Sequence, residues 1–160
     1  MSSSNFALRS WRKMKKLPLG TQAFSRVVST RAPYFMTISP HITELEPGRC
    51  TVEMKKRWIV TNHLGTVHAI AMCNLAEVAG GLMAEVSTPA THRWIPKGMT
   101  VEYRKKATTD LRAECRAEPL PEFGTEGFNW PVTVDVFDRE GQNVFGATIT
   151  MWISPRRADA

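Results

Sequence analysis

The chain has 160 residues, of which 42% are hydrophobic and 22% are charged, and its formal net charge is +6. This length and balance are ordinary for one globular domain with a sizeable core. No apolar run approaches the roughly 20 residues that span a bilayer, and no nucleic-acid-binding motif is recognised, so we expect neither stable membrane insertion nor a nucleic-acid partner.

The three cysteines, Cys50, Cys73 and Cys115, are far apart, and each falls on an apolar position of its segment. They form no CxxC motif and have no His partner at metal-ligand spacing. We therefore expect reduced thiols in the core of a cytoplasmic protein, and no metal site.

Positive charge is concentrated at the N-terminus. Residues 1–43 hold seven Lys and Arg and no acid, whereas the other 117 residues hold 14 basic and 15 acidic side chains. This pattern is compatible with a transit peptide, or with an arm attracted to phosphates or to an anionic membrane surface. We favour an amphipathic helical arm over residues 1–32 with solvated charges, in two helices at about 6–17 and 21–30. Its docking residues at helical spacing are Trp11, Met14, Leu17, Phe24, Val27 and Val28.

Two short strands, 41–46 and 49–58, precede a long helix over 69–86. The helix is built mostly from Ala, Gly, Leu, Met and Val, and Glu77 and Glu85 are its only charged residues. Beyond it, apolar residues alternate with polar ones around 99–104, 111–117, 132–136 and 145–153. Alternation with short connections predicts an antiparallel sheet. We predict an α+β fold: a single domain over 33–155 in which the long helix packs against a sheet of about six strands.

Glu77 stands halfway along a helix whose composition favours burial. At 100° per residue it shares a narrow arc with Asn74, Gly81 and Glu85, and this arc lacks the Lys, Arg or Gln of a typical solvated face. We therefore interpret Glu77 as a carboxylate in a confined space, where its reactivity can be tuned, and Glu85 as a surface residue near the helix end.

The loop before the helix, residues 61–68, is polar and contains a glycine. With Thr66 as N-cap, the first backbone N–H groups, including that of Ala69, would be unpaired at the positive helix end, where they can polarise a carbonyl oxygen. Taken singly, Asn62, Gly65 and His68 have ordinary explanations as a turn former, a positive-φ position and a helix-start hydrogen bonder.

Taken together, Asn62, Gly65, His68 and Glu77, followed by TVEYRKKATTDLRAECRA, resemble the hotdog-fold acyl-CoA thioesterases of the phenylacetate-pathway type. Those have an Asn-x-x-Gly-x-x-His-Gly-Gly loop, a long central helix with an acid nine residues after the His, and then antiparallel strands. The segments APYF and HRWIPKGMTVEY are similar to an uncharacterised sub-group of that superfamily. The resemblance covers essentially the whole chain and implies a hotdog fold, with a central helix wrapped by a curved sheet.

The resemblance also implies catalytic roles. In that family the loop Asn positions the attacking water, the amide N–H after the His polarises the thioester carbonyl, and the helix acid acts as general base or nucleophile. Carried across, these roles fall on Asn62, on the N–H of Ala69 with His68 beside it, and on Glu77, with Gly65 in the same loop. The sequence departs from the family in two places: His-Ala-Ile replaces His-Gly-Gly, and Glu77 stands where many relatives have Asp.

The spacing of two of these residues predicts an oligomer. Ala69 and Glu77 are eight residues apart, roughly 12 Å along a helix that rises 1.5 Å per residue. A Glu side chain does not close this gap to meet one carbonyl carbon. We therefore expect a homodimer with composite active sites, and possible association into a dimer of dimers.

We expect hydrolysis of an acyl-CoA thioester, with no cofactor apart from the CoA of the substrate. Candidates for the acyl pocket are Tyr34, Phe35 and Met72. Candidates for binding the CoA phosphates are Arg93, Lys97 and Arg104, with Lys105 and Lys106.

Two other functions remain open. Non-catalytic acyl-CoA binding would use the same fold and dimer. The replacement of His-Gly-Gly by His-Ala-Ile is compatible with this function. Hydroxyacyl dehydration would pair His63 with Glu77, but the Pro-rich loop around the His of hotdog dehydratases is absent, so we rank it below hydrolysis.

Overall fold

The structure is a computed structural model that describes residues 6–156, so the first five residues of the predicted arm lie outside it. The helices are α1 (Phe6–Met14), α2 (Gly20–Arg31) and α3 (Ala69–Ser87), with short 3-10 helices η1 (Pro33–Thr37) and η2 (Trp58–Val60). The strands are β1 (His41–Glu46), β2 (Arg49–Met54), β3 (His92–Tyr103), β4 (Leu111–Arg116), β5 (Phe128–Phe137) and β6 (Asn143–Pro155).

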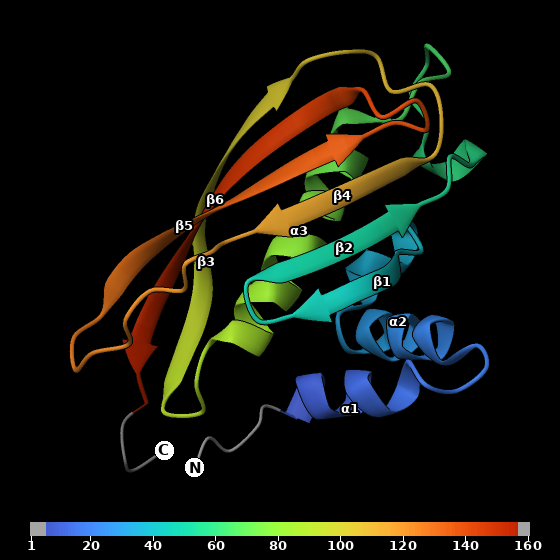
Figure 1. The fold of residues 1–160 in the computed structure, drawn as a ribbon. Helices are drawn as coiled ribbons and strands as arrows, with labels where there is room; N and C mark the ends of the chain where they lie inside the picture. Colours follow the sequence, from blue (N-terminus) through green and yellow to red (C-terminus); the bar gives the residue numbers. More distant parts are fainter. Residues whose placement is uncertain (1–5, 157–160) are drawn as a thin grey trace.

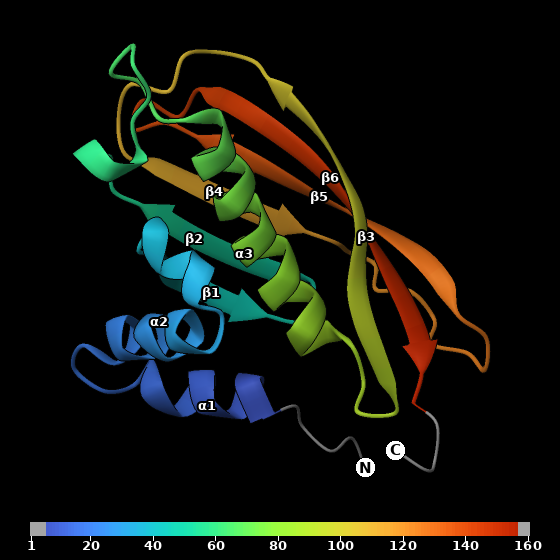
Figure 2. The same cartoon turned by 180° about the vertical axis from the view of Figure 1, so that it is seen from behind.

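The strands form one antiparallel sheet in the order β1-β2-β4-β5-β6-β3. The sheet curves around α3, and α1 and α2 lie beyond its β1 edge, while β3 forms the opposite edge (Figure 1). This arrangement confirms the predicted α+β class and is a hotdog fold. Figure 2 shows the side of α3 that the sheet leaves open.

Two adjacent glycines allow α3 to lie close to the sheet. A Cβ atom at Gly80 would lie 2.9 Å from Cδ1 of Ile149 on β6, and one at Gly81 would lie 3.3 Å from the indole of Trp94 on β3. Glycine in a helix interior is otherwise unfavourable, so close packing explains the pair.

The core lies between α3 and the inner face of the sheet, as the alternating pattern predicted. Cys50 on β2 and Cys115 on β4 are register partners in it, both buried and unbonded. Burial raises the pKa of Cys115 to about 12 and that of Cys50 well above its ordinary value, so both thiols are unreactive. Among residues 6–156, α3 is the one helix long and apolar enough to cross a membrane, and more than half of it is buried in the domain.

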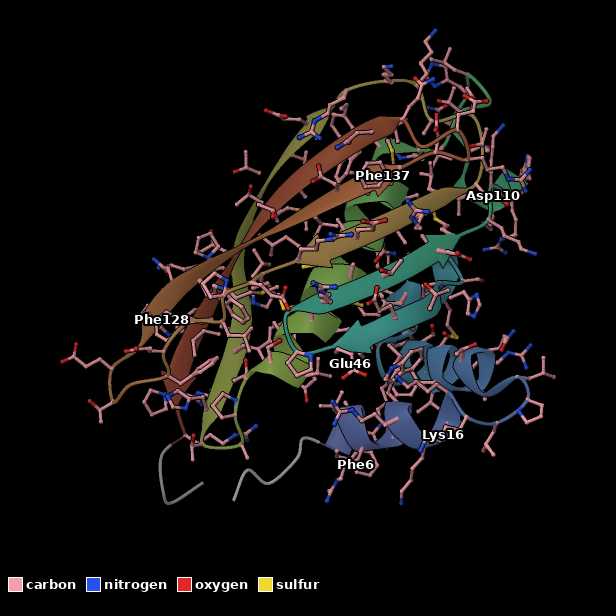
Figure 3. All side chains as sticks on the ribbon, in the orientation of Figure 1. Phe6, Lys16, Glu46, Asp110, Phe128 and Phe137 are labelled. Atoms are coloured by element: carbon pink, nitrogen blue, oxygen red, sulfur yellow. The ribbon has the colours of Figure 1, made fainter. Side chains whose placement is uncertain are left out.

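The arm is anchored by fewer residues than predicted. Trp11 and Phe24 are buried against each other, with ring centroids 5.2 Å apart, and Arg12 of α1 pairs with Glu46 of β1. Glu46 lies between α1 and the sheet (Figure 3). However, α1 ends at Met14 rather than at residue 17, and two predicted docking residues, Leu17 and Val27, are exposed.

Element ends differ from the predictions where the chain turns. The strand predicted over 49–58 ends at Met54, and residues 58–60 form η2 instead. In contrast, β3 begins at His92, well before the predicted alternation at 99. Pro96 and Gly98 flank a register shift in β3, and such a bulge, like a proline, is tolerated because this strand is at the sheet edge.

Candidate active site

The loop before α3 is organised by Asn62. Its Oδ1 accepts from the N–H groups of Leu64 (3.0 Å) and Thr66 (3.2 Å), and its Nδ2 donates to the Thr66 hydroxyl (2.9 Å). Gly65 has φ +72°, which confirms the predicted positive-φ position. The carboxamide of Asn62 therefore holds the loop in one conformation, and one of its two Nδ2 hydrogens has no partner among the described residues.

The prediction that Thr66 caps the helix is wrong. Helix α3 begins at Ala69, with His68 as N-cap, and Nδ1 of His68 accepts from the N–H of Ile70 at 3.1 Å. The N–H groups of Val67 and His68 are paired elsewhere in the fold, whereas the N–H of Ala69 has no hydrogen-bond partner among the described residues. A free donor thus lies at the positive end of the long helix.

A cavity of about 320 Å³ lies beside this helix start. Its wall comes from η1, η2 and the first turns of α3, and consists of Tyr34, Thr37, Ile38, Ile59, Val60, His68, Ile70, Ala71 and Asn74. Of the three residues predicted for the acyl pocket, only Tyr34 contributes to it. Met72 is 4% exposed and belongs to the core, and Phe35 packs against the core, because both point into the domain.

Asn74 is a buried polar residue in the cavity wall. Its Nδ2 donates to Oγ1 of Thr37 at 3.2 Å, and the Thr37 hydroxyl is itself used to donate to the carbonyl oxygen of Tyr34. Both neighbours on this side are therefore acceptors, which fixes the orientation of the carboxamide. Asn74 ties η1 to α3 and holds the cavity wall in place, while its Oδ1 is buried without a partner.

Glu77 is exposed in the single chain, on the open side of α3. The expected confinement is therefore not provided by this chain, because the sheet covers other faces of the helix. Glu85 is near the helix end, as predicted, but is only partly exposed: its Oε2 accepts from Nε1 of Trp94 at 2.8 Å, in a half-buried contact that ties β3 to α3. On one helix, Ala69 and Glu77 remain about 12 Å apart along the axis.

The sequence did not identify the contact between Cys73 and Tyr103. The Cys73 thiol lies 3.4 Å from the Tyr103 hydroxyl, at the end of β3 and one helical turn before Glu77. This hydrogen bond raises the pKa of Tyr103, so its phenol is neutral at physiological pH. The two residues meet because the end of β3 packs against α3, which the sequence does not show. The alternation around 99–104 did place Tyr103 in a strand.

The cationic candidates on and beside β3 do not form one cluster. Arg93 and Arg104 are near opposite ends of β3, eleven residues and roughly 36 Å apart along the strand. Arg104 is also paired with Asp135 at 2.8 Å and with Glu102, and Lys97 lies over the ring of Trp152. Arg93 is exposed, and within residues 6–156 its side chain donates to the hydroxyl of Ser154 and to no other group.

Large apolar side chains are unusually exposed around the helix start and along β3. They are Tyr34, Trp58, Ile59, Leu64, Ile70, Ile95 and Tyr103, each more than half exposed.

Among residues 6–156, no group of three or more His, Cys, Asp or Glu is placed to hold a metal ion.

A second and larger cavity, of about 530 Å³, lies between α2 and the start of β1. Arg26, Met36 and His41 contribute to its wall. No residue predicted for the site lines it, and it is lined by no part of α3.

The chain belongs to a family described as "Domain of unknown function (DUF4442)", whose profile matches residues 20–153. No curated protein matches the chain significantly.

Several solved structures share the fold. One crystal structure, described only as a genomics target, is 42% identical, with a TM-score of 0.81, and the match covers 94% of this chain and 99% of that one. A Pseudomonas aeruginosa protein of unknown function, described as a probable thioesterase, is 23% identical, with a TM-score of 0.76 and coverage of 88% and 97%. A Haemophilus influenzae thioesterase is 11% identical, with a TM-score of 0.67 and coverage of 79% and 87%. The three structures thus share the fold of this chain, and two of them are described as thioesterases.

Proposed function

We propose that this member of the family is an acyl-CoA thioesterase that acts as a homodimer with composite active sites. The observation that carries the proposal is the free N–H of Ala69, at the start of α3 and beside a cavity, on a helix that also presents an exposed carboxylate at Glu77. An unpaired donor at a helix N-terminus stabilises the negative charge that develops on a carbonyl oxygen during acyl transfer.

The surface around the site supports a dimer. Strand β3 is an edge strand of 12 residues, and Ile95 and Tyr103 on it are 60% and 51% exposed. The unpaired N–H and C=O groups of an edge strand can pair with another strand, and large exposed apolar side chains on it favour burial in a contact. A two-fold contact along β3 would cover this edge and bring Glu77 of one protomer towards the helix start of its partner, where it would be confined.

In the proposed reaction the thioester carbonyl oxygen accepts from the N–H of Ala69, with His68 holding the start of the helix. Glu77 of the partner protomer takes a proton from water as the water oxygen attacks the carbonyl carbon. When the tetrahedral intermediate collapses, the carbon–sulfur bond breaks, and the proton passes from Glu77 to the departing CoA sulfur. The products are a free acid and CoA, so no cofactor is required.

The loop geometry supports a positioning role for Asn62 and Gly65 in this proposal. The side chain of Asn62 bonds to Leu64 and Thr66 within the loop, and Gly65 supplies the positive φ that closes it. Together they hold His68 and the first turn of α3, so Asn62 acts through the backbone rather than by binding the attacking water. The phenylacetate-pathway relationship remains part of this proposal.

The cavity size favours a short, medium or aromatic acyl group. About 320 Å³ is at the lower end of small-molecule pockets, and Tyr34, Ile38 and Ile70 supply apolar wall. For the CoA phosphates, Arg93 and Lys97 are the better candidates on β3, because neither has a carboxylate partner among the described residues, whereas Arg104 pairs with Asp135 and Glu102.

Free thiols at Cys50 and Cys115 support a cytoplasmic location. The two residues are register partners on adjacent strands, yet remain unbonded in the core. A reducing compartment fits this arrangement.

Non-catalytic acyl-CoA binding is the second candidate, and the exposure of Glu77 in the single chain favours it, because this chain alone does not confine the carboxylate beside the cavity. Dehydration has less support, since His63 is exposed in the loop and contributes nothing to the cavity wall.

The test is release of CoA thiol from short, medium, long and aromatic acyl-CoAs by wild type, Glu77→Gln and Glu85→Gln. Glu85 is a matched control two turns further along α3, and its amide variant keeps an acceptor for Trp94. We expect Glu77→Gln to lower kcat about 1000-fold, as loss of a general base does, and Glu85→Gln to change it less than about threefold. Tight binding of CoA esters without turnover by wild type would replace hydrolysis with the binding function.

A further inference from the structure

The α1–α2 hairpin carries large apolar side chains that are not packed into the domain. Phe6, Leu17 and Leu19 are 66%, 62% and 74% exposed. Leu17 and Leu19 flank Pro18 in the turn between the helices, which projects from the edge of the molecule (Figure 1). Trp11 and Phe24 attach the hairpin to the domain, so the exposed residues do not contribute to this attachment.

In the turn, Leu19 has a backbone conformation that is unfavourable for leucine. Leu19 has φ 57° and ψ 14°, a left-handed conformation that suits glycine or asparagine, and as N-cap of α2 it makes no side-chain capping bond. The next residue must be glycine, because a Cβ atom at Gly20 would overlap the carbonyl oxygen of Met14. A strained, exposed leucine at a position better suited to asparagine indicates a function outside the fold.

Basic side chains accompany these apolar groups. Phe6, Arg9 and Lys13 recur at helical intervals along the outer face of α1, and Lys16 and Leu17 continue this spacing into the turn. Arg9, Lys13 and Lys16 are exposed, and no carboxylate among the described residues pairs with them. Phe6 and Lys16 lie near the two ends of α1 (Figure 3).

Two neighbouring cations, Arg12 and Lys15, attach α1 to the sheet instead. Arg12 and Lys15 both pair with Glu46, at 2.6 and 3.1 Å, and so fasten α1 to β1. Attachment of the hairpin to the domain therefore uses other cations, and the three on the outer face remain available to a partner.

We propose that the outer face of the hairpin, comprising Phe6, Arg9, Lys13, Lys16, Leu17 and Leu19, docks this protein on an anionic lipid surface. Leucines on a projecting turn enter the headgroup layer, and the flanking cations bind lipid phosphates. A convex apolar tip with a basic rim fits a lipid surface better than a groove in a protein. This is reversible docking, distinct from insertion of a spanning helix, and it does not depend on the proposed hydrolysis.

The test is co-flotation of the full-length chain with phosphatidylcholine vesicles that contain either no anionic lipid or about 30% phosphatidylglycerol. We expect flotation with the anionic vesicles alone, and less of it as salt is raised. Arg9→Gln/Lys13→Gln/Lys16→Gln should weaken binding about 100-fold, roughly fivefold for each cation. The control Lys55→Gln/Arg57→Gln/Lys106→Gln removes the same charge elsewhere on the surface and should bind nearly as well as wild type.

A second variant separates docking from folding. Leu19→Asn should weaken vesicle binding at least about tenfold, because an apolar side chain no longer enters the lipid. It should also raise the unfolding temperature, because asparagine suits the left-handed conformation and can cap α2. Absence of flotation with anionic vesicles would overturn the proposal. Equal losses of vesicle binding in the two triple variants would also overturn it.

Discussion

The two halves of α3 meet very different surroundings. In the C-terminal half, Gly80 lies against β6, and Gly81 and Glu85 lie against Trp94 of β3. In the N-terminal half, Ile70 and Glu77 are exposed, and a cavity opens beside the first turns. The C-terminal half is thus covered within the chain, whereas the N-terminal half presents apolar side chains and the proposed catalytic carboxylate to solvent. The difference teaches that the sheet of one chain encloses only part of α3, and that the proposed site lies on the part it leaves open.

The largest effect is expected from removal of one donor in the open half. Ala69→Pro deletes the free N–H, and proline at the first position of a helix is well tolerated. His68 already has φ −65° and ψ 139°, the extended conformation required before proline. We expect kcat to fall about 100- to 1000-fold, as on loss of an oxyanion donor, with no loss of stability.

The matched control for this variant is Ala69→Gly, which retains the N–H and restores a residue type found in the resembling family. It should keep most of the activity of wild type. If Ala69→Pro hydrolysed acyl-CoA as fast as Ala69→Gly, the N–H of Ala69 would have no part in the reaction.

Substitutions in the C-terminal half of α3 should change the free energy of unfolding rather than kcat. Gly80→Val places a branched side chain where even a Cβ atom lies 2.9 Å from Ile149, which is fully buried, so we expect a loss of about 3 kcal/mol from overpacking. Gly81→Ala meets only the edge of Trp94 at 3.3 Å and gains helix propensity, so its net change should stay within about 0.5 kcal/mol. Urea denaturation measures both, and equal losses would contradict the described packing of α3.

The smallest effect concerns the arm, outside both halves. The hydrogen bond from Arg12, with Lys15 nearby, lowers the pKa of Glu46 below its ordinary value of 4.5. This stabilisation is therefore fully present above about pH 4.5 and is lost as the pH falls through the lowered pKa. Because Glu46 is only partly buried, we expect less than about 1 kcal/mol.

Thermal unfolding between pH 7 and pH 3 tests this ion pair. The unfolding temperature of wild type should fall more steeply below pH 4.5 than that of Glu46→Gln. Parallel curves would show that the pair contributes nothing measurable to the attachment of α1.

Much of the fold was predictable because it follows from local periodicity. The helix over 69–86 and the alternating segments gave the α+β class, and β1 has the predicted bounds. The cap at His68, the contact of Trp94 with Glu85 and the contact of Cys73 with Tyr103 were not predicted. Each depends on how distant segments meet, and periodicity within one segment carries no information about that.

The residues of the candidate site were easier to predict from the sequence than the environment of each residue. The loop and the helix acid stand out by spacing, and the structure places Gly65 as expected. The acyl-pocket residues were harder to predict, because an apolar residue such as Met72 fits core and cavity equally well in the sequence. The exposure of Glu77 was also missed, since composition does not show which arc of a helix the sheet leaves open.

The most direct test of the composite site is complementation between two inactive variants. Glu77→Gln and Ala69→Pro chains are unfolded together, mixed in equal amounts and refolded, and CoA release is compared with that of each variant alone. If Ala69 and Glu77 act across a two-fold interface, half of the dimers are mixed and each regains one intact site, so activity should recover to about a quarter of the wild-type value. A mixture that stays as inactive as its two components would contradict the composite site.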